Sequence, residues 1–402
     1  MEERTSISRF WTDNANLGLA TVVAGLFNTL YSLILGHALG PKNYGWVAAL
    51  NSLVSLFLLP LPVIGLLAIR WGKPDGKKNR LATMTWGLGG GIFLLAVALS
   101  GVLGRGLHLP SSLIAVFAVS IIFNFGYTLY VGYLERARRY RVVGVLVASS
   151  SVFGVLAVSA AVTVGHSHPI VWLGVFQATL LVLLFYWARR ASRHLPPVPP
   201  TRLLTRVLAT TLGVGTLQSL WGLSDSLWAK ANLNAHDAGI YTGLVTIGQA
   251  VPFAVASVAT VMLTAVLDEP ERRRYFLLRA LLTALALDGV FLTILTIVPG
   301  TLVRLALGTA FLPMTPLIRH YGEAMAALAL VGVLATYGVA VGAYGAMVGS
   351  ALGTTMWIVS LGYAHTMAAL VARTRIAMVL TLVLTAVGLW WERGRRQGRP
   401  DS

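Results

Sequence analysis

The amino-acid sequence predicts an all-α polytopic membrane protein with about 12 transmembrane helices. Charged residues make up only 11% of the 402 residues, less than half of the roughly 25% found in soluble globular domains. Hydrophobic residues make up 56%, and they gather in runs long enough to cross a bilayer. This composition excludes a soluble enzyme, a disulfide-stapled secreted domain and a disordered chain.

The apolar runs divide into two sets of six. The first set lies at 15–36, 44–69, 81–103, 113–134, 142–165 and 170–188, and the second at 207–229, 240–266, 277–298, 321–345, 347–371 and 374–391. The longest connection, 189–206, contains four prolines, a composition that suits an extended, semi-rigid linker. We therefore expect an N-terminal six-helix lobe at 1–188 and a C-terminal six-helix lobe at 207–402.

The basic residues record the topology of these spans. The formal charge of +17 would suggest nucleic acid binding in a soluble protein. Here, however, 24 of the 31 Lys and Arg residues lie at the termini and in the even-numbered connections. Basic residues are enriched on the cytoplasmic side of membranes. This pattern predicts a protein of the cytoplasmic (inner) membrane with both termini in the cytoplasm, and it needs no nucleic acid partner.

An offset of 194 residues aligns the two halves of the chain. It places the stretch 39–46 (LGPKNYGW) on 233–240 (LNAHDAGI), so that Gly45 falls on Gly239. Each stretch connects the first two spans of its half. Proline breaks the second span of each half as well, and the hinge candidates are Pro60, Pro62 and Pro252. Paired breaks of this kind point to a binding cavity or a bending helix, although neighbouring helices also tolerate ordinary proline kinks.

The stretch 39–45 resembles the LGPxxYG turn of the polysaccharide-exporter branch of the multidrug/oligosaccharidyl-lipid/polysaccharide flippase superfamily. Asp225 followed by the stretch 237–241 (DAGIY) is similar to the D…(E/D)xGxY pattern of that branch, and the basic turn 136–141 is also similar. The first span lacks the early Arg-Asp pair of the peptidoglycan-precursor flippases, which disfavours their substrate.

The resemblance implies a fold, a substrate and partners. The two six-helix lobes would surround a central cavity and alternate between inward-open and outward-open states. The substrate would be a lipid-linked (polyprenyl-pyrophosphate) oligosaccharide, flipped for surface polysaccharide biosynthesis. An H⁺ or Na⁺ gradient would drive the cycle, and membrane lipids, a polysaccharide polymerase and glycosyltransferases would be the partners. The protein would not be an enzyme and would need no cofactor.

Three acidic residues within the spans are the candidates for ion coupling, because an ionisable group at the bilayer centre costs about 2.5–3.5 kcal/mol on insertion scales. They are Asp225, Asp288 and Glu323. Asp225 has an alternative reading as a packing contact with Lys230, and Asp288 as a hydrogen bond to a Ser or Thr of a neighbouring helix.

A second group of residues consists of candidates for a substrate cavity. Arginine binds pyrophosphate oxygens through its planar fork, whereas amides and Trp can line a sugar path. The candidates are Arg70, Arg279, Arg304, Trp221, Gln218, Gln249 and Asn28. Arginines near span ends also bind lipid headgroups, and buried amides also hold helices together.

The sequence contains no P-loop and no catalytic or metal-ligand constellation. A multidrug or small-solute secondary transporter is one alternative function. A membrane-embedded glycosyltransferase or ligase is another, but such enzymes need a large outer loop with catalytic carboxylates or Arg. The longest predicted outer loop, 299–320, holds no Asp or Glu.

Overall fold

The computed structural model describes residues 2–71, 80–137, 139–165, 168–195, 220–221 and 223–397. The described residues are helical almost throughout. Nine helical spans among them are long and apolar enough to cross a membrane. Residues group into two compact units, one from 1–39 and 53–212 and the other from 40–52 and 213–402. The predicted boundaries at 188 and 207 stay predictions. The segment 40–52 groups with the second unit, which the sequence did not indicate.

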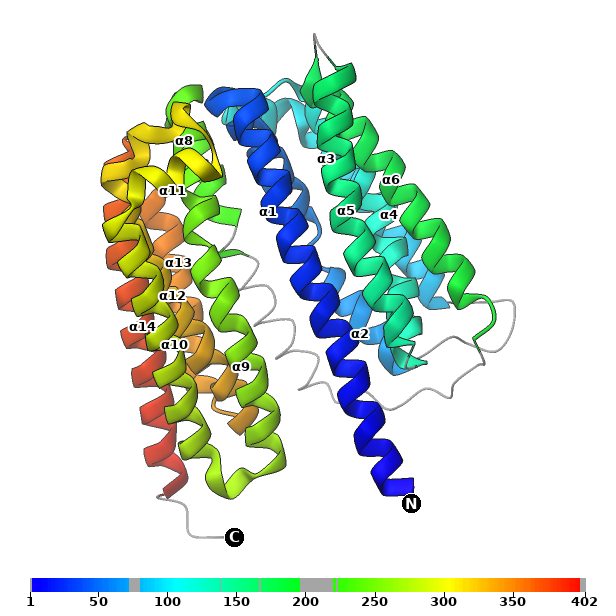
Figure 1. Ribbon diagram of the computed structural model, residues 1–402, viewed down its shortest axis with the longest axis vertical. Coiled ribbons are helices and arrows are strands. Elements are labelled where there is room, and N and C mark those ends of the chain that lie inside the picture. The colour runs from blue at the N-terminus through cyan, green and yellow to red at the C-terminus, as the bar shows by residue number, and fades with distance from the viewer. Residues whose placement is uncertain are drawn as a thin grey trace. The chain divides into compact units, whose positions relative to one another are not determined.

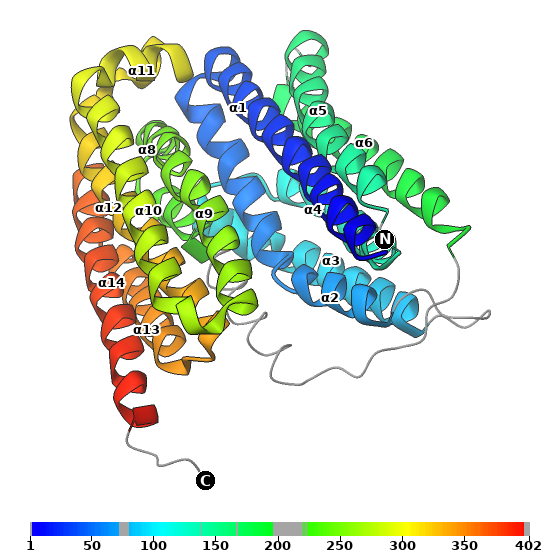
Figure 2. The same cartoon turned by 60° about the horizontal axis from the view of Figure 1, so that its bottom comes forward.

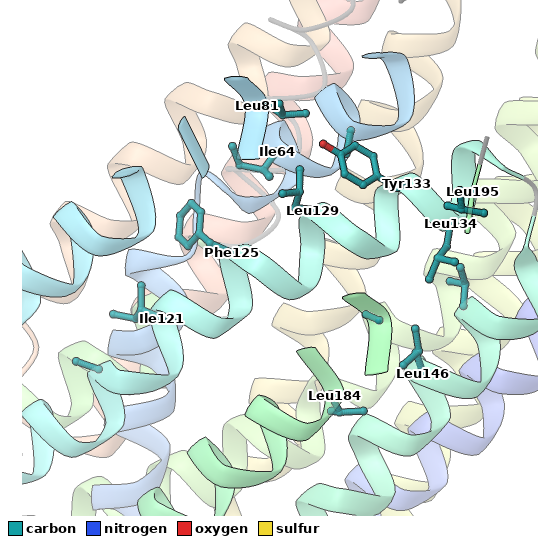
Figure 3. Close-up of a cluster of buried hydrophobic side chains, with 14 of the residues drawn as sticks. Ile64, Leu81, Ile121, Phe125, Leu129, Tyr133, Leu134, Leu146, Leu184 and Leu195 are labelled. Carbon is teal, nitrogen blue, oxygen red and sulfur yellow. The ribbon is translucent and has the colours of Figure 1, made fainter. Parts of the chain in front are cut away.

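The described residues of the first unit form α2 to α6 besides the start of α1 (Figures 1 and 2). Their bounds are α1 (Glu2–Phe57), α2 (Leu61–Trp71), α3 (Arg80–Leu107), α4 (Ser111–Arg136), α5 (Tyr140–Val164) and α6 (Pro169–Ser192). Helix α4 packs against α2, α3 and α6 and is the centre of this unit. Spacing of four residues aligns large side chains on one face of a helix. Four large buried residues of α4 follow this spacing and lie in the core seen in Figure 3: Ile121, Phe125, Leu129 and Tyr133.

The second unit repeats this plan with its own fourth long helix at the centre. After a described helical stretch at 223–232, its elements are α8 (Ala235–Gly248), α9 (Ala250–Asp268), α10 (Arg273–Ile297), α11 (Pro299–Ala306), α12 (Thr315–Val341), α13 (Tyr344–Leu361) and α14 (Met367–Gln397), with short 3₁₀ turns at Pro270–Arg272 and Thr309–Met314. Helix α12 packs against α8, α9, α10, α13 and α14. It is the tenth predicted span, as α4 is the fourth, so the centre of each unit lies at the same place in the predicted repeat.

The two turns that the repeat aligns lie in contact. Helix α1 bends at Gly40, whose φ of 65° and ψ of 174° are non-helical. A Cβ atom on Gly45 would lie 2.7 Å from the Cα atom of Gly239, and one on Gly239 would overlap the carbonyl oxygen of Pro41. Tyr44 anchors the turn, because its hydroxyl lies 2.7 Å from Thr246 Oγ1. Glycine is therefore required at both aligned positions by close backbone approach.

The proline breaks fall where the helices are interrupted. The second predicted span, 44–69, is divided between two helices. Helix α1 ends at Phe57, and α2 begins at Leu61, directly after Pro60. The eighth, 240–266, is interrupted at Gln249, three residues before Pro252. Pro252 sits in the first turn of α9, where its missing N–H costs no helical hydrogen bond. Whether these breaks act as hinges stays a prediction.

One predicted boundary is wrong. The eleventh span was expected to run to 371, but α13 ends at Leu361 and α14 begins at Met367. Hydropathy misses this turn because 362–371 remains largely apolar. The Asn232 side-chain amide donates to the carbonyl oxygens of Leu361, Gly362 and Ala364 at 3.0, 3.3 and 3.0 Å. Since the last carbonyls of a helix lack helical partners, this amide stabilises the end of α13.

Candidate functional site

Asp225 lies at the centre of a buried cluster of hydroxyl groups in the second unit. It is 0% exposed. Its Oδ2 accepts a hydrogen bond of 2.5 Å from the Tyr321 hydroxyl of α12. Its Oδ1 accepts bonds from Tyr241 of α8 at 3.2 Å and from Thr374 of α14 at 3.3 Å. The carboxyl group thus joins the helical stretch 223–232 to three other helices.

The hydroxyl donors explain how a carboxylate can be buried at this position. A buried charge is tolerated when hydrogen bonds compensate it, and bonds to a charged acceptor are about twice as strong as neutral ones. Trp357 of α13 holds the Thr374 hydroxyl through its Nε1, at 3.2 Å. Two carboxyl oxygens and three hydroxyl oxygens therefore form one hydrogen-bonded group. Such a group can hold a proton or a monovalent cation.

For Asp225 the alternative reading was a packing contact with the nearby Lys230. Among the described residues the two side chains form no ion pair. The oxygens of Asp225 accept from hydroxyl groups instead, and the Lys230 ammonium lies over the ring of Trp46.

Asp288 differs from Asp225 in having no partner. It lies on α10, is 3% exposed, and neither of its carboxyl oxygens accepts a hydrogen bond from any described residue. The Ser or Thr contact considered for it is therefore not found in the described part of the chain. Leu292 and Leu295 on the same helix pack against Gly322 of α12, so this stretch of α10 faces the central helix of the unit. A carboxyl group without donors is unusual, because buried polar groups are normally hydrogen-bonded.

Glu323 belongs to a partly exposed network of ion pairs. Its side chain is 32% exposed and its oxygens lie 3.3 Å from Arg319 Nε and 3.2 Å from Arg375 Nη1. His320 Nδ1 lies 3.5 Å from the same carboxylate. Two guanidinium groups compensate this carboxylate, so Glu323 differs from both buried aspartates.

Three of the predicted cavity and hinge residues lie together. Trp221, Gln249 and Pro252 line a pocket of about 300 Å³ within the second unit, with small or apolar side chains of α9 and α12 around them. Trp221 is held there by a hydrogen bond of 2.7 Å from its Nε1 to Thr354 Oγ1. The pocket is thus mostly apolar, with an indole ring and an amide at its wall. A larger groove of about 930 Å³ over α13 and α14 contains none of the predicted residues.

The remaining candidates do not gather at this pocket. Arg279 is exposed on α10, where its guanidinium stacks over Tyr275 with 5.0 Å from Cζ to the ring centroid. Arg304 is exposed on α11, and Asn28 is exposed on α1 in the first unit. The side chain of Arg70 and the whole of Gln218 lie outside the described residues. No group of three or more His, Cys, Asp or Glu able to hold a metal ion occurs in the described ranges.

Sequence reasoning identified Asp225 but missed its donors. Tyr241 is the last residue of the DAGIY stretch that the sequence analysis identified, but no role was assigned to it. Tyr321 and Thr374 carry no sequence signal, because they lie 96 and 149 residues from Asp225.

Comparison with solved structures finds similar proteins, whereas comparison of the sequence does not. No family model matches the sequence, and no curated protein sequence is similar to it. The solved structure of the lipid II flippase MurJ in an inward closed conformation is similar with a TM-score of 0.70 at 13% identity, over 96% of this chain and 93% of that one. An inward-facing multidrug resistance MATE family transporter of the MOP superfamily is similar with a TM-score of 0.65 at 12% identity, over 93% of this chain and 94% of that one.

These likenesses extend to a eukaryotic protein and establish the fold. The eukaryotic MATE transporter AtDTX14 is similar with a TM-score of 0.56 at 11% identity, over 98% of both chains. The predicted all-α polytopic membrane fold with about 12 transmembrane helices is confirmed, and it is the fold shared by MurJ and MATE transporters.

Proposed function

We propose that this protein is a flippase that moves a lipid-linked (polyprenyl-pyrophosphate) oligosaccharide across the cytoplasmic membrane by alternating access. The observation that carries the proposal is the match of nearly the whole chain to a flippase of a lipid-linked substrate. The LGPxxYG turn supports an oligosaccharide carrier as the substrate, and that turn is anchored by Tyr44 and Gly45. The protein would then work beside a polysaccharide polymerase and glycosyltransferases.

Asp225 is the ion-coupling residue in this proposal. Its carboxylate binds three other helices of the same unit through side-chain hydroxyls. Exchange of a proton or Na⁺ at this carboxylate would change the hydrogen bonds that hold those helices together. A ligand shifts a conformational equilibrium only through such a difference in interaction between two states.

A multidrug or small-solute transporter is the second candidate. The 300 Å³ pocket beside Trp221 and Phe253 favours it, because that pocket is apolar and falls at the lower limit of the volumes typical of small-molecule sites. MATE transporters share the fold over a comparable length of chain.

Deletion of the gene separates these functions. The flippase predicts loss of surface polysaccharide with accumulation of the lipid-linked oligosaccharide on the inner leaflet, reversed by the intact gene. Accumulation of lipid II in its place would assign a peptidoglycan precursor as substrate. Unchanged polysaccharide with increased sensitivity to small amphipathic cations would assign multidrug export.

The proposed orientation can be tested directly because the chain has no cysteine. Single substitutions at two exposed positions, Ser111→Cys and Glu271→Cys, introduce one thiol each. With both termini in the cytoplasm, a membrane-impermeant maleimide labels Ser111→Cys in intact cells and Glu271→Cys only after permeabilisation. The reverse pattern would invert the topology.

A further inference from the structure

Two lysines lie around one indole ring in the second unit. The Nζ of Lys42 is 5.9 Å from the centroid of the Trp46 ring, and the Nζ of Lys230 is 5.6 Å from it. Lys42 follows the bend in α1 and is exposed, whereas Lys230 in the stretch 223–232 is only 2% exposed. Two cations are thus concentrated at one aromatic side chain, although like charges repel each other.

No described carboxylate neutralises this pair of cations. The ion pairs of the described residues involve neither lysine. The acidic residues nearest to Lys230 in the sequence are Asp225 and Asp237. Asp225 accepts from three hydroxyls, and Asp237 accepts from the Asn234 side-chain amide at 2.8 Å.

The cation–π contact with the Trp46 indole does not offset the free-energy cost of burying Lys230. A cation–π contact returns less free energy than the removal of an unpaired ammonium from water costs. The ring also contributes a donor of its own, since the Trp46 Nε1–H group is buried and no described residue accepts from it. The buried indole N–H therefore lacks an acceptor among the described residues, and it lies beside two ammonium groups that have no described counterion. Water can accept the hydrogen bonds, whereas a bound anion accepts them and also balances the charge.

We propose that Lys42, Trp46 and Lys230 form an oxyanion site that binds a phosphate group. A tetrahedral phosphate presents several oxygens and can accept from the two ammonium groups and the indole N–H together, and lysine is a common phosphate ligand. The site lies at the end of the second unit that carries the turn 40–46, which the charge pattern places at the outer surface. A phospholipid headgroup and free phosphate are the two sources of such a group. The site is separate from the Asp225 cluster and does not depend on the transported substrate.

Binding to the purified protein in a phosphate-free detergent tests the proposal. Inorganic phosphate is titrated in one series and short-chain phosphatidylglycerol in another, with thermal unfolding as the readout. We expect saturable stabilisation of the wild type by at least one probe. Saturation by phosphatidylglycerol alone assigns a lipid headgroup, and saturation by inorganic phosphate assigns a free anion. Lys230→Met should weaken binding about tenfold or more, and Lys42→Gln less, because Lys42 is exposed.

Stability without the probe distinguishes a binding role from a structural one. Because Lys230→Met removes a buried cation without a counterion, this variant should unfold no earlier than the wild type in phosphate-free solution and should fail to gain from the probe. Arg105→Gln is the matched control, since Arg105 is an exposed cation of the first unit whose Nε donates only to the Gly101 carbonyl. The proposal is overturned if the wild type binds neither probe saturably, or if Lys230→Met binds as tightly as the wild type.

Discussion

The two units share one plan but differ in what they bury. In the first unit, α4 contributes Ile121, Phe125 and Leu129 to an apolar core. In the second unit, the equivalent helix α12 places Tyr321 against a buried carboxylate. Every buried charged residue in the described part of the chain belongs to the second unit: Asp225, Lys230 and Asp288. In the described part of the chain, the buried charged groups are therefore confined to one unit.

Truncation of a side chain in the apolar core of the first unit should have the largest effect on the free energy of unfolding. Phe125→Ala is expected to lower the free energy of unfolding by about 3–5 kcal/mol, because Phe125 is 0% exposed and packs against Gly89. Unfolding in mixed detergent micelles measures it. Leu94→Ala, at an exposed position of α3, is the control and should cost far less. Equal losses in the two variants would remove the distinction between core and surface in this unit.

Asp225→Asn should affect transport more than stability. The amide keeps the shape of the carboxyl group but loses the charge and one of the two acceptor oxygens, because its NH2 group cannot accept from a hydroxyl, a loss of about 1–3 kcal/mol. Export of the lipid-linked oligosaccharide should fall at least tenfold. Glu269→Gln, which removes an exposed carboxylate paired only with Arg272, should export normally. Normal export by Asp225→Asn would end the proposal of coupling at this residue.

Asp288→Asn should not lower the free energy of unfolding, in contrast to Asp225→Asn. Its carboxyl oxygens have no described donor, so a neutral amide is easier to bury, and the free energy of unfolding should stay equal or rise slightly. Export is nevertheless expected to fall if Asp288 carries a proton during the cycle. A marked loss of stability in this variant would show that the carboxyl group has a partner in the folded protein.

The smallest effect is expected at the exposed network. Arg375→Gln removes one of the two guanidinium partners of Glu323, and partly exposed ion pairs contribute about 0.2–1 kcal/mol. Unfolding at low and at high salt measures the loss, which should shrink at high salt because surface charges are screened. A larger, salt-independent loss would place Glu323 with the buried carboxylates.

The fold was predictable because hydropathy and basic residues act over short stretches. Spans such as α5 and α10 differ from their predicted ranges by a few residues. The end of α13 was not predictable, since it depends on Asn232, which lies 129 residues from Leu361 in the chain. The candidate site likewise was predictable where the signal is local and not where it depends on residues distant in the chain. A carboxylate in an apolar span identifies Asp225, but the hydroxyls that bind it come from distant helices. Lys42 was counted only as an outer basic residue, and Lys230 also as a possible partner of Asp225, because nothing in the sequence shows that both lysines lie at the Trp46 ring.

The contact between Gly45 and Gly239 has a consequence for how the halves of this chain diverge. If the repeat arose by duplication, these glycines descend from a single residue that packed against its own copy. Any side chain at that position of an ancestral half would have appeared twice in the same space, as happens on the axis of a symmetric dimer. On that origin, fusion of the halves would have removed this restriction from most positions, such as Lys42, which aligns with His236. The backbone contact itself has kept glycine on both sides.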